Sequence, residues 1–307
     1  MDQGVFCICF AIFVVLVLQK AFFMKTILFT LMTTLMAASG FTQDNEIRLL
    51  VRADDIGSFH AANEACIESY QNGIVRSVEL MVPCAWYPEA VIMLNENPGL
   101  DVGIHLVLTS EWSNVKWRPL THCSGLVDSD GYFFPMVWKN DNFPPGSSLS
   151  EASWTMEEVE TELRAQIEQA LRHVPQITHL SCHMGFTYLD PRLQALYVSL
   201  ANEYKLSTEA TGLEWFTGWG KDVRPEERID AFCQNLEKLE PGSYFFLDHP
   251  GKATDEMKTV GHKGYENVDI DREWVTRVFT SEKVMETIRK KGIKLISYAD
   301  LMQELNK

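Results

Sequence analysis

Short apolar runs alternate with longer amphipathic stretches from residue 47 to the end of the chain. An apolar run bounded by turn-forming residues favours a buried strand, whereas apolar residues spaced three and four apart favour a helix. The pattern predicts strands at residues 47–53, 77–82, 102–108, 177–182, 207–210, 244–247 and 294–297. It predicts helices at residues 60–71, 90–94, 151–172, 191–204 and 272–290, and another that begins at residue 225. Strands that alternate with helices favour a parallel sheet, so we predict an α/β fold, a TIM-like (β/α) barrel of about seven strands that is closed or nearly closed.

A long irregular stretch, residues 109–149, follows the third predicted strand and is rich in Trp, Pro, Gly and Ser. In a barrel, such a loop would cover the C-terminal face, where loops shape specificity. No internal repeat or interdomain linker interrupts the alternation of elements. We therefore predict one domain, residues 41–307, because a single α/β barrel typically has roughly 250 residues.

Two apolar segments precede this domain. Residues 5–18 are uninterrupted apolar, but the run is shorter than the roughly 20 residues that span a bilayer. Residues 24–40 begin with Met24, carry Lys25 before an apolar centre, and end in small residues, which is the layout of a secretory signal. We predict that residues 1–40 are a signal segment, that Met24 is the true start, and that the protein is secreted or periplasmic. An uncleaved membrane anchor is the alternative.

The chain is acidic, with a formal net charge of −15 at pH 7. This charge would repel nucleic acids and anionic membrane surfaces, so we expect neither as a stable partner. The seven cysteines are scattered and include no CxxC pair, which argues against a zinc knuckle or a disulfide framework. A neutral small substrate fits the composition better, and the sequence leaves the oligomeric state open, a dimer included.

Four of the predicted strands end in residues that can bind a metal or move a proton. These residues are Asp54 and Asp55, His105, His179 and His183, and Asp248 and His249. Side chains at the C-terminal ends of parallel strands form the active sites of α/β barrels. Two histidines and one carboxylate are a common ligand set that leaves positions for water and substrate. The pattern indicates a metal-dependent hydrolase.

The adjacent carboxylates Asp54 and Asp55 could divide the chemistry. Successive side chains of a strand alternate, so we expect these two to point in different directions, one toward a metal and the other toward a water on it. Taken by itself, the pair could also be a turn before Gly57. The histidines favour the first interpretation.

Five segments form a recognisable set of motifs. They are RADDIG at residues 52–57, GIHLVLT at 103–109, SGLVDSDGYFF at 124–134, HPG at 249–251 and SYADL at 297–301. The set resembles the YdjC-like carbohydrate deacetylases, a family that includes chitooligosaccharide deacetylases, and Asn63 stands where the family has a further Asn. The resemblance spans essentially all of residues 41–307. It implies a metal-dependent hydrolase that removes an N-acetyl group from an amino sugar or short oligosaccharide.

The resemblance also implies residue roles. Asp55, His105 and His183 would hold one divalent metal ion, Asp54 would be the general base, and His249 would protonate the leaving group or stabilise the transition state. The family is associated with magnesium, but two histidine donors would also suit zinc, manganese or cobalt.

The chain departs from the family motifs at two places. Arg52 replaces the Asn before the Asp pair, which adds a cation beside the carboxylates. The family motif T-H-x-D-S-H-x-H-x-H stands here as THLSCHMGF at residues 178–186, so Ser181 replaces the Asp and the later histidines are absent from the segment that holds Met184 and Phe186. Metal binding would survive these changes, but substrate contacts could differ.

Aromatic residues after several strands could form a platform for a sugar ring. They are Trp112, Trp117, Tyr188, Trp215, Phe216 and Trp219. Trp215 and Trp219, together with Arg52 and His179, are our candidates for substrate contact. Some of the aromatic residues could instead plug the barrel mouth or the helix layer. Two other functions stay open, namely hydrolysis of another amide, ester or phosphate bond, and carbohydrate binding without catalysis.

Overall fold

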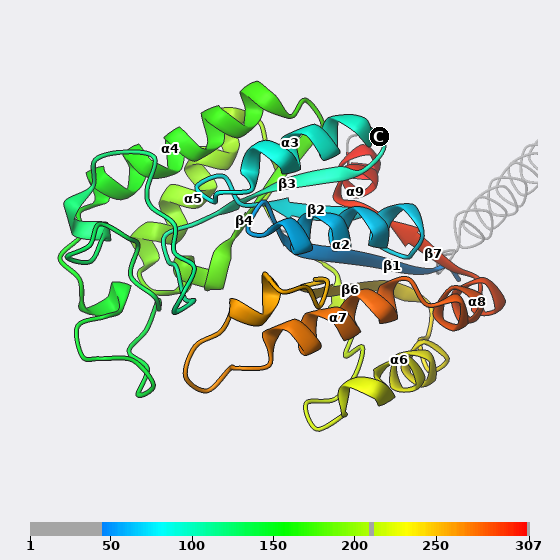
Figure 1. The fold of residues 1–307 in the computed structure, drawn as a ribbon. Helices are drawn as coiled ribbons and strands as arrows, with labels where there is room; N and C mark the ends of the chain where they lie inside the picture. Colours follow the sequence, from blue (N-terminus) through cyan, green and yellow to red (C-terminus); the bar gives the residue numbers. More distant parts are fainter. Residues whose placement is uncertain (1–44, 209–211, 306–307) are drawn as a thin grey trace, which may run out of the picture. The chain divides into compact units, whose positions relative to one another are not determined.

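A seven-stranded sheet whose strand pairs are all parallel forms the centre of the computed structural model, which describes residues 45–208 and 212–305 (Figure 1). The strands are β1 (Ile47–Ile56), β2 (Ser77–Leu80), β3 (Asp101–Leu106), β4 (Ile177–Cys182), β5 (Glu214–Trp215), β6 (Gly242–Asp248) and β7 (Ile293–Ile296). Their order is β4-β3-β2-β1-β6-β5, with β7 also paired to β1. The proposed signal segment, residues 1–40, and Met24 lie outside the described residues.

β1 is the central strand because it pairs with three others. β6 follows one edge of it over residues 47–53. The other edge is shared, with β7 beside residues 47–50 and β2 beside residues 52–56. Nine of its ten residues are buried, as expected for a parallel strand covered on both faces. The Asp pair therefore lies at the end of a central strand that is almost entirely buried.

Helices cover the outside of the curled sheet (Figure 1). They are α2 (His60–Gln71), α3 (Tyr87–Glu96), α4 (Met156–His173), α5 (Pro191–Tyr204), α6 (Arg228–Leu236), α7 (Val268–Phe279), α8 (Glu282–Lys291) and α9 (Tyr298–Leu305). Short 3₁₀ turns are η1 (Ser124–Leu126), η2 (Leu149–Glu151), η3 (His183–Tyr188), η4 (Pro225–Glu227) and η5 (Met257–Thr259). Within the described ranges, no helix is both long and apolar enough to cross a membrane.

Local capping explains where two helices begin. Thr155 and Glu158 form a reciprocal capping box that starts α4. α5 starts at Pro191, whose fixed φ suits the first helical position, after Asp190 accepts a hydrogen bond from the backbone of Arg192. The predicted helices at 60–71 and 191–204 and the strand at 177–182 are confirmed to the residue.

The predicted helix at 272–290 is wrong as a single element, because it consists of parts of α7 and α8. The chain leaves the helical conformation at Thr280, and the carbonyl of Phe279 accepts a hydrogen bond from the backbone of Ile74 at 3.0 Å. That tertiary contact uses a carbonyl which a continuing helix would need. The short strand β5 and the final helix α9 were not predicted.

The prediction of an α/β fold with about seven parallel strands is confirmed. In the described part of the chain, β4 and β5 are the two ends of the strand order and do not pair with each other. The predicted strand at 207–210 is reduced to one bridge between Ser207 and His179, and its residues 209 and 210 lie outside the described ranges. The sheet is thus an open, curled half-barrel.

Candidate metal and catalytic site

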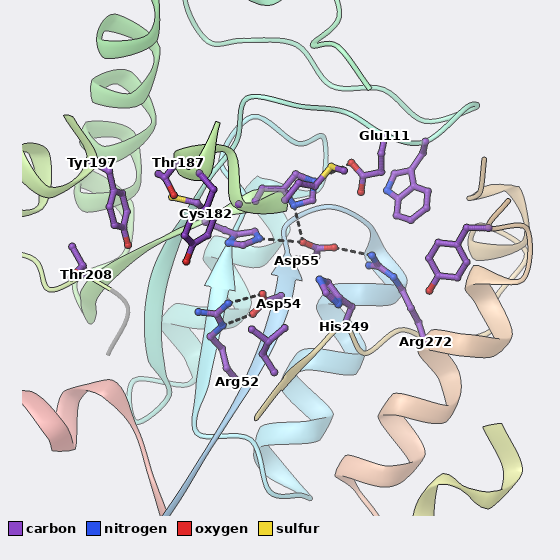
Figure 2. A pocket seen from close by; sticks show the side chains of 18 of the residues that line it. Arg52, Asp54, Asp55, Glu111, Cys182, Thr187, Tyr197, Thr208, His249 and Arg272 are labelled. Carbon is purple, nitrogen blue, oxygen red and sulfur yellow. Dashed lines mark hydrogen bonds and ion pairs between the residues drawn. The ribbon is translucent and has the colours of Figure 1, made fainter. Parts of the chain in front are cut away.

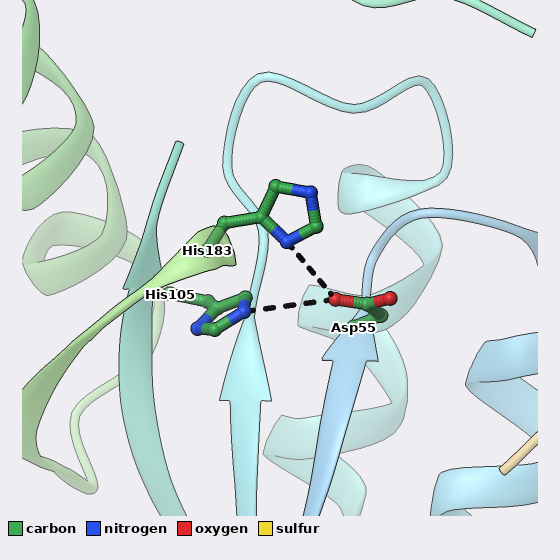
Figure 3. Close-up of side chains that lie close together, drawn as sticks. All are labelled: Asp55, His105 and His183. Atoms are coloured by element: carbon green, nitrogen blue, oxygen red, sulfur yellow. Dashed lines mark ion pairs between the residues drawn. The ribbon is translucent and has the colours of Figure 1, made fainter. Parts of the chain in front are cut away.

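Three side chains converge at the carboxyl ends of β1, β3 and β4 (Figure 3). Asp55 Oδ1 lies 3.7 Å from His105 Nε2 and 3.5 Å from His183 Nδ1. All three side chains are buried. Parallel strands bring their carboxyl ends to one edge of the sheet, so residues far apart in the sequence meet here.

The backbone at Asp55 explains how two adjacent carboxylates serve one site. Asp55 has φ of 73°, and the pairing of β1 with β2 shifts register between Ala53 and Ile56. Asp is among the few residues that tolerate this left-handed conformation. Asp54 and Asp55 both line the same cavity, as a division of the chemistry between them requires. Gly57, with φ of 102°, completes the bend; a Cβ there would lie 2.7 Å from the carbonyl oxygen of Met81.

Each histidine of the triad has a second partner that sets which nitrogen faces Asp55. His183 Nε2 lies 3.0 Å from Glu111 Oε2, and only an N–H can bond to that carboxylate, so Nδ1 is turned toward Asp55. His105 Nδ1 lies 2.7 Å from Ser181 Oγ, which leaves Nε2 for Asp55. Partners of this kind hold metal-binding histidines in orientation.

The electrostatics of the triad favour a cation. Burial lowers the pKa of His105 to about 3, so this imidazole is neutral at pH 7. Burial also acts to lower the pKa of His183, but the Glu111 and Asp55 carboxylates outweigh it and raise the pKa to about 10. Burial acts to raise the pKa of Asp55, yet His249, Arg272 and His183 hold it well below its usual range. The carboxylates therefore attract positive charge to this position.

The donor set fits a metal ion. Asp55 Oδ1 is buried and has no hydrogen-bond partner among the described residues, an expensive arrangement unless another group binds it. Two ligand atoms about 2.1 Å from one tetrahedral ion are about 3.4 Å apart, close to the separations from Asp55 to the two histidines. Asp55, His105 and His183 would hold a divalent ion and leave a position for water or substrate.

Metal binding is expected to release one proton. Below the raised pKa of about 10, His183 carries a proton that an ion must displace, so apparent affinity should rise about tenfold per pH unit from pH 6 to 9. Calorimetric titration of the metal-free protein in buffers of different ionisation enthalpy would measure the proton count. An affinity that does not change over this range would contradict the displacement.

Asp54 lies beside the triad and is held by Arg52 (Figure 2). Arg52 donates from Nε to Asp54 Oδ1 at 2.7 Å and from Nη2 to Oδ2 at 2.9 Å. Both side chains are almost fully buried, and both residues line the cavity. The two-point contact fixes the plane of the carboxylate, which is the positioning that a general base requires.

His249 faces the same cavity from the end of β6. Its side chain is 36% exposed, and Nδ1 lies 3.5 Å from Asp248 Oδ1. Partial burial acts to lower the pKa of His249, but the negative charge of Asp55 and the contact with the Asp248 side chain outweigh it, and the net pKa is raised. A raised pKa favours the protonated imidazole, the form that a general acid needs.

The cavity has a volume of about 620 Å³, within the range of small-molecule sites. Trp112 and Tyr188 line it, and Tyr188 is 84% exposed at the rim. Trp215 and Trp219 do not belong to the described lining. Trp215 is 59% exposed on the edge strand β5, and Trp219 packs against Phe246 in the core.

His179 is not placed for substrate contact. It is fully buried beneath the site, with Nε2 2.7 Å from Glu79 Oε1 and Nδ1 2.8 Å from Thr178 Oγ1. It does not belong to the described lining of the cavity. His179 is the third residue of β4 and lies four residues before His183, so it points to the same face but sits below the strand end that His183 follows.

Three charged residues of the site were not predicted from the sequence. Glu111 contacts His183, Arg272 on α7 donates from Nη2 to Asp55 Oδ2 at 2.8 Å, and Glu79 lies below them on β2. Glu111 and Arg272 sit in a loop and a helix, outside the strand ends that were searched. Glu79 did carry a signal, since an acidic residue within the apolar run at 77–82 needs a buried partner.

Comparisons with known proteins place this chain among similar proteins. The family model described as YdjC-like protein matches residues 48–290. A carbohydrate deacetylase of Thermus thermophilus is 34% identical over 241 residues, which cover 69% of this chain and 80% of that protein. A chitooligosaccharide deacetylase of Yersinia enterocolitica is 26% identical, over 82% of this chain and 98% of that protein. A crystal structure from Enterococcus faecalis, of a protein named for cellobiose-phosphate cleavage, shares the fold with a TM-score of 0.65, 22% identity, and coverage of 83% of this chain and 99% of that one.

Proposed function

Because the chain belongs to the YdjC-like protein family, we propose that it is a metal-dependent carbohydrate deacetylase that removes an N-acetyl group from an amino sugar or short oligosaccharide. The observation that carries the proposal is the buried triad of Asp55, His105 and His183 beside Asp54 in one cavity. The names of the relatives from Thermus thermophilus and Yersinia enterocolitica support the substrate class.

A divalent ion held by the triad would lower the pKa of a bound water toward about 7 and polarise the acetamide carbonyl. The residues of the chain supply the remaining steps. Asp54, oriented by Arg52, takes the proton of the attacking water. His249 gives a proton to the amine nitrogen as the C–N bond breaks, and the products are acetate and a free amino sugar.

The sugar would contact the rim of the cavity near Tyr188. This ring is the most exposed aromatic side chain of the lining, and a tyrosine offers an apolar face together with a polar hydroxyl. Trp112 forms part of the same wall, although it is itself almost fully buried. These two residues take the place of Trp215 and Trp219 as our candidates for substrate contact.

The identity of the metal ion is part of the proposal. Two imidazole nitrogens and one carboxylate suit zinc, cobalt or manganese, whereas magnesium prefers oxygen ligands. Magnesium, which the family resemblance implies, would use the same three residues with more water. Affinity for each ion, measured on the metal-free protein, would rank them.

We also propose that the barrel is nearly closed. The backbone of Ser207 supports this, since it donates to Thr178 at 3.0 Å and accepts from Leu180 at 2.9 Å, next to the edge strand β4.

We further propose that the protein is secreted or periplasmic. The signal-like layout of residues 24–40 supports this. Mass spectrometry of the exported protein would reveal cleavage near Phe41.

The proposed function is tested by acetate release from N-acetylated chitooligosaccharides. We expect metal-free protein to release none, and protein supplied with one divalent ion in turn (Mg, Mn, Co or Zn) to release acetate with at least one of them. Acylated sugars, simple esters and sugar phosphates serve as competing substrates. Turnover of these without amide cleavage would replace the deacetylase with another hydrolase, and sugar binding without any turnover would indicate a non-catalytic relative.

A further inference from the structure

A buried carboxylate lies below the metal triad and is connected to it. Glu79 is fully buried on β2, between the strands that carry Asp55 and His105. It accepts a hydrogen bond from the Ser181 hydroxyl, and His179 Nε2 lies 2.7 Å from its other oxygen. Since Ser181 also contacts His105, the carboxylate is one hydroxyl away from a metal ligand.

Counting the protons along these hydrogen bonds shows which ring nitrogen of His105 carries its proton. The Ser181 hydroxyl has one proton and donates it to Glu79. The Ser181 oxygen can then only accept from His105 Nδ1, 2.7 Å away, so Nδ1 carries the proton of that bond. A neutral imidazole has a single N–H, which leaves the lone pair on Nε2, the nitrogen that faces Asp55.

His179 keeps Glu79 in its anionic form. Thr178 donates its only hydroxyl proton to Asp101 at 2.6 Å, so it accepts from His179 Nδ1 at 2.8 Å. His179 Nε2 faces the Glu79 carboxylate and must also be protonated to bond with it. Burial acts to lower the pKa of His179, but the Glu79 carboxylate outweighs it and the pKa is raised. An anionic Glu79 accepts protons and donates none.

The Glu79 and His179 side chains fit beside β3 only because residue 103 is glycine. A Cβ at Gly103 would lie 2.3 Å from Glu79 Oε2 and 2.4 Å from His179 Nε2. Neither contact is sterically allowed, so β3 carries a glycine where the pair crosses it. The pair is therefore built into the packing of three strands.

We propose that Glu79 is a positioning residue of the metal site, which acts through Ser181 to hold His105 in the tautomer that offers Nε2 to the ion. It supplies the negative charge that the related motif has as an Asp at position 181, moved to the neighbouring strand. The inference rests on the metal site proposed above. It requires no substrate, so it is tested separately from deacetylation.

Loss of the hydroxyl tests the connection. Ser181→Ala is expected to lower the affinity of the metal-free protein for zinc 10- to 100-fold, as measured by competition with a chromophoric chelator. Ser77→Ala is the matched control, because Ser77 is equally buried and also donates to a buried carboxylate, Asp101 at 2.7 Å, without contacting the triad. The proposal is overturned if Ser181→Ala binds zinc as tightly as the unaltered protein, or if Ser77→Ala loses as much affinity.

Restoring the charge at another position tests the role of Glu79. Glu79→Gln is expected to lower zinc affinity by a similar factor, since Gln cannot hold the Ser181 proton as a carboxylate does. The double variant Glu79→Gln with Ser181→Asp places a carboxylate directly against His105 Nδ1, and affinity should return to within about threefold of the unaltered protein. If the double variant binds zinc no better than Glu79→Gln alone, the proposal that the Glu79 charge positions His105 is refuted.

Nitrogen-15 NMR of the unaltered, metal-free protein reads the tautomer directly and depends on no variant that could misfold. His105 should be a neutral imidazole protonated at Nδ1. A ring protonated at Nε2, or a mixture of both tautomers, would mean that the Glu79–Ser181 chain does not set it. Neither result depends on whether the protein deacetylates a sugar.

Discussion

Asp54→Asn is expected to lower the rate of acetate release about 10²- to 10⁴-fold, the usual contribution of a general base. Asn has nearly the same shape as Asp but cannot accept the proton of the attacking water. Asp54 does not belong to the metal triad, so zinc affinity should stay close to that of the unaltered protein. The measurements are the turnover rate with saturating metal and the metal affinity of the same sample. A variant that keeps most of its rate would refute the base role.

The contact with Arg52 makes a second variant necessary. Asn at position 54 turns an N–H toward the guanidinium that now donates twice to Asp54, so part of the loss could come from a disturbed Arg52. Arg52→Asn, which restores the residue of the family motif, breaks the same contact and keeps the carboxylate. We expect its rate to fall about tenfold or less, because the base remains and only its orientation suffers. Equal losses in the two variants would assign the effect to the ion pair.

The residues at the strand ends could be predicted because apolar runs reveal the strands, and because parallel strands end at the same edge of a sheet. Apolar runs located the starts of the strand that carries Asp55 and of the strand that His183 follows. Parallel strands bring their carboxyl ends together, so the metal-binding residues had to meet if the sheet was parallel. The expected triad converges to within 4.8 Å for this reason.

The charged residues that contact the triad from outside the strand ends could not be located in the same way. Glu111 comes from an irregular loop and Arg272 from a helix, and no spacing rule connects either to a strand end. The bend at Asp55 needs a positive φ, which a periodic pattern cannot reveal. His179 was a candidate for substrate contact, but it lies four residues before His183 on β4, which places it below the strand end and against Glu79.

Removing the anionic metal ligand should have an effect at least as large as removing the base. Asp55→Asn is expected to abolish tight metal binding and to lower acetate release about 10³-fold or more, because without the ion the pKa of the attacking water returns toward 15.7. Asn tolerates the positive φ of 73° at this position, and its side-chain oxygen can still accept from Arg272. The backbone bend should therefore survive, and the loss should come from the missing charge.

Chelated, unaltered protein is the reference for this variant. Metal returned to it should restore the rate, whereas the same additions to Asp55→Asn should not. Glu162→Gln controls for the loss of a buried carboxylate, since Glu162 on α4 is fully buried and accepts from the backbones of Leu120 and Thr121, away from the triad. If excess metal brings Asp55→Asn to the unaltered rate, the two histidines suffice to hold the ion. The buried Asp55 Oδ1, which has no hydrogen-bond partner among the described residues, would then need another explanation than a metal bond.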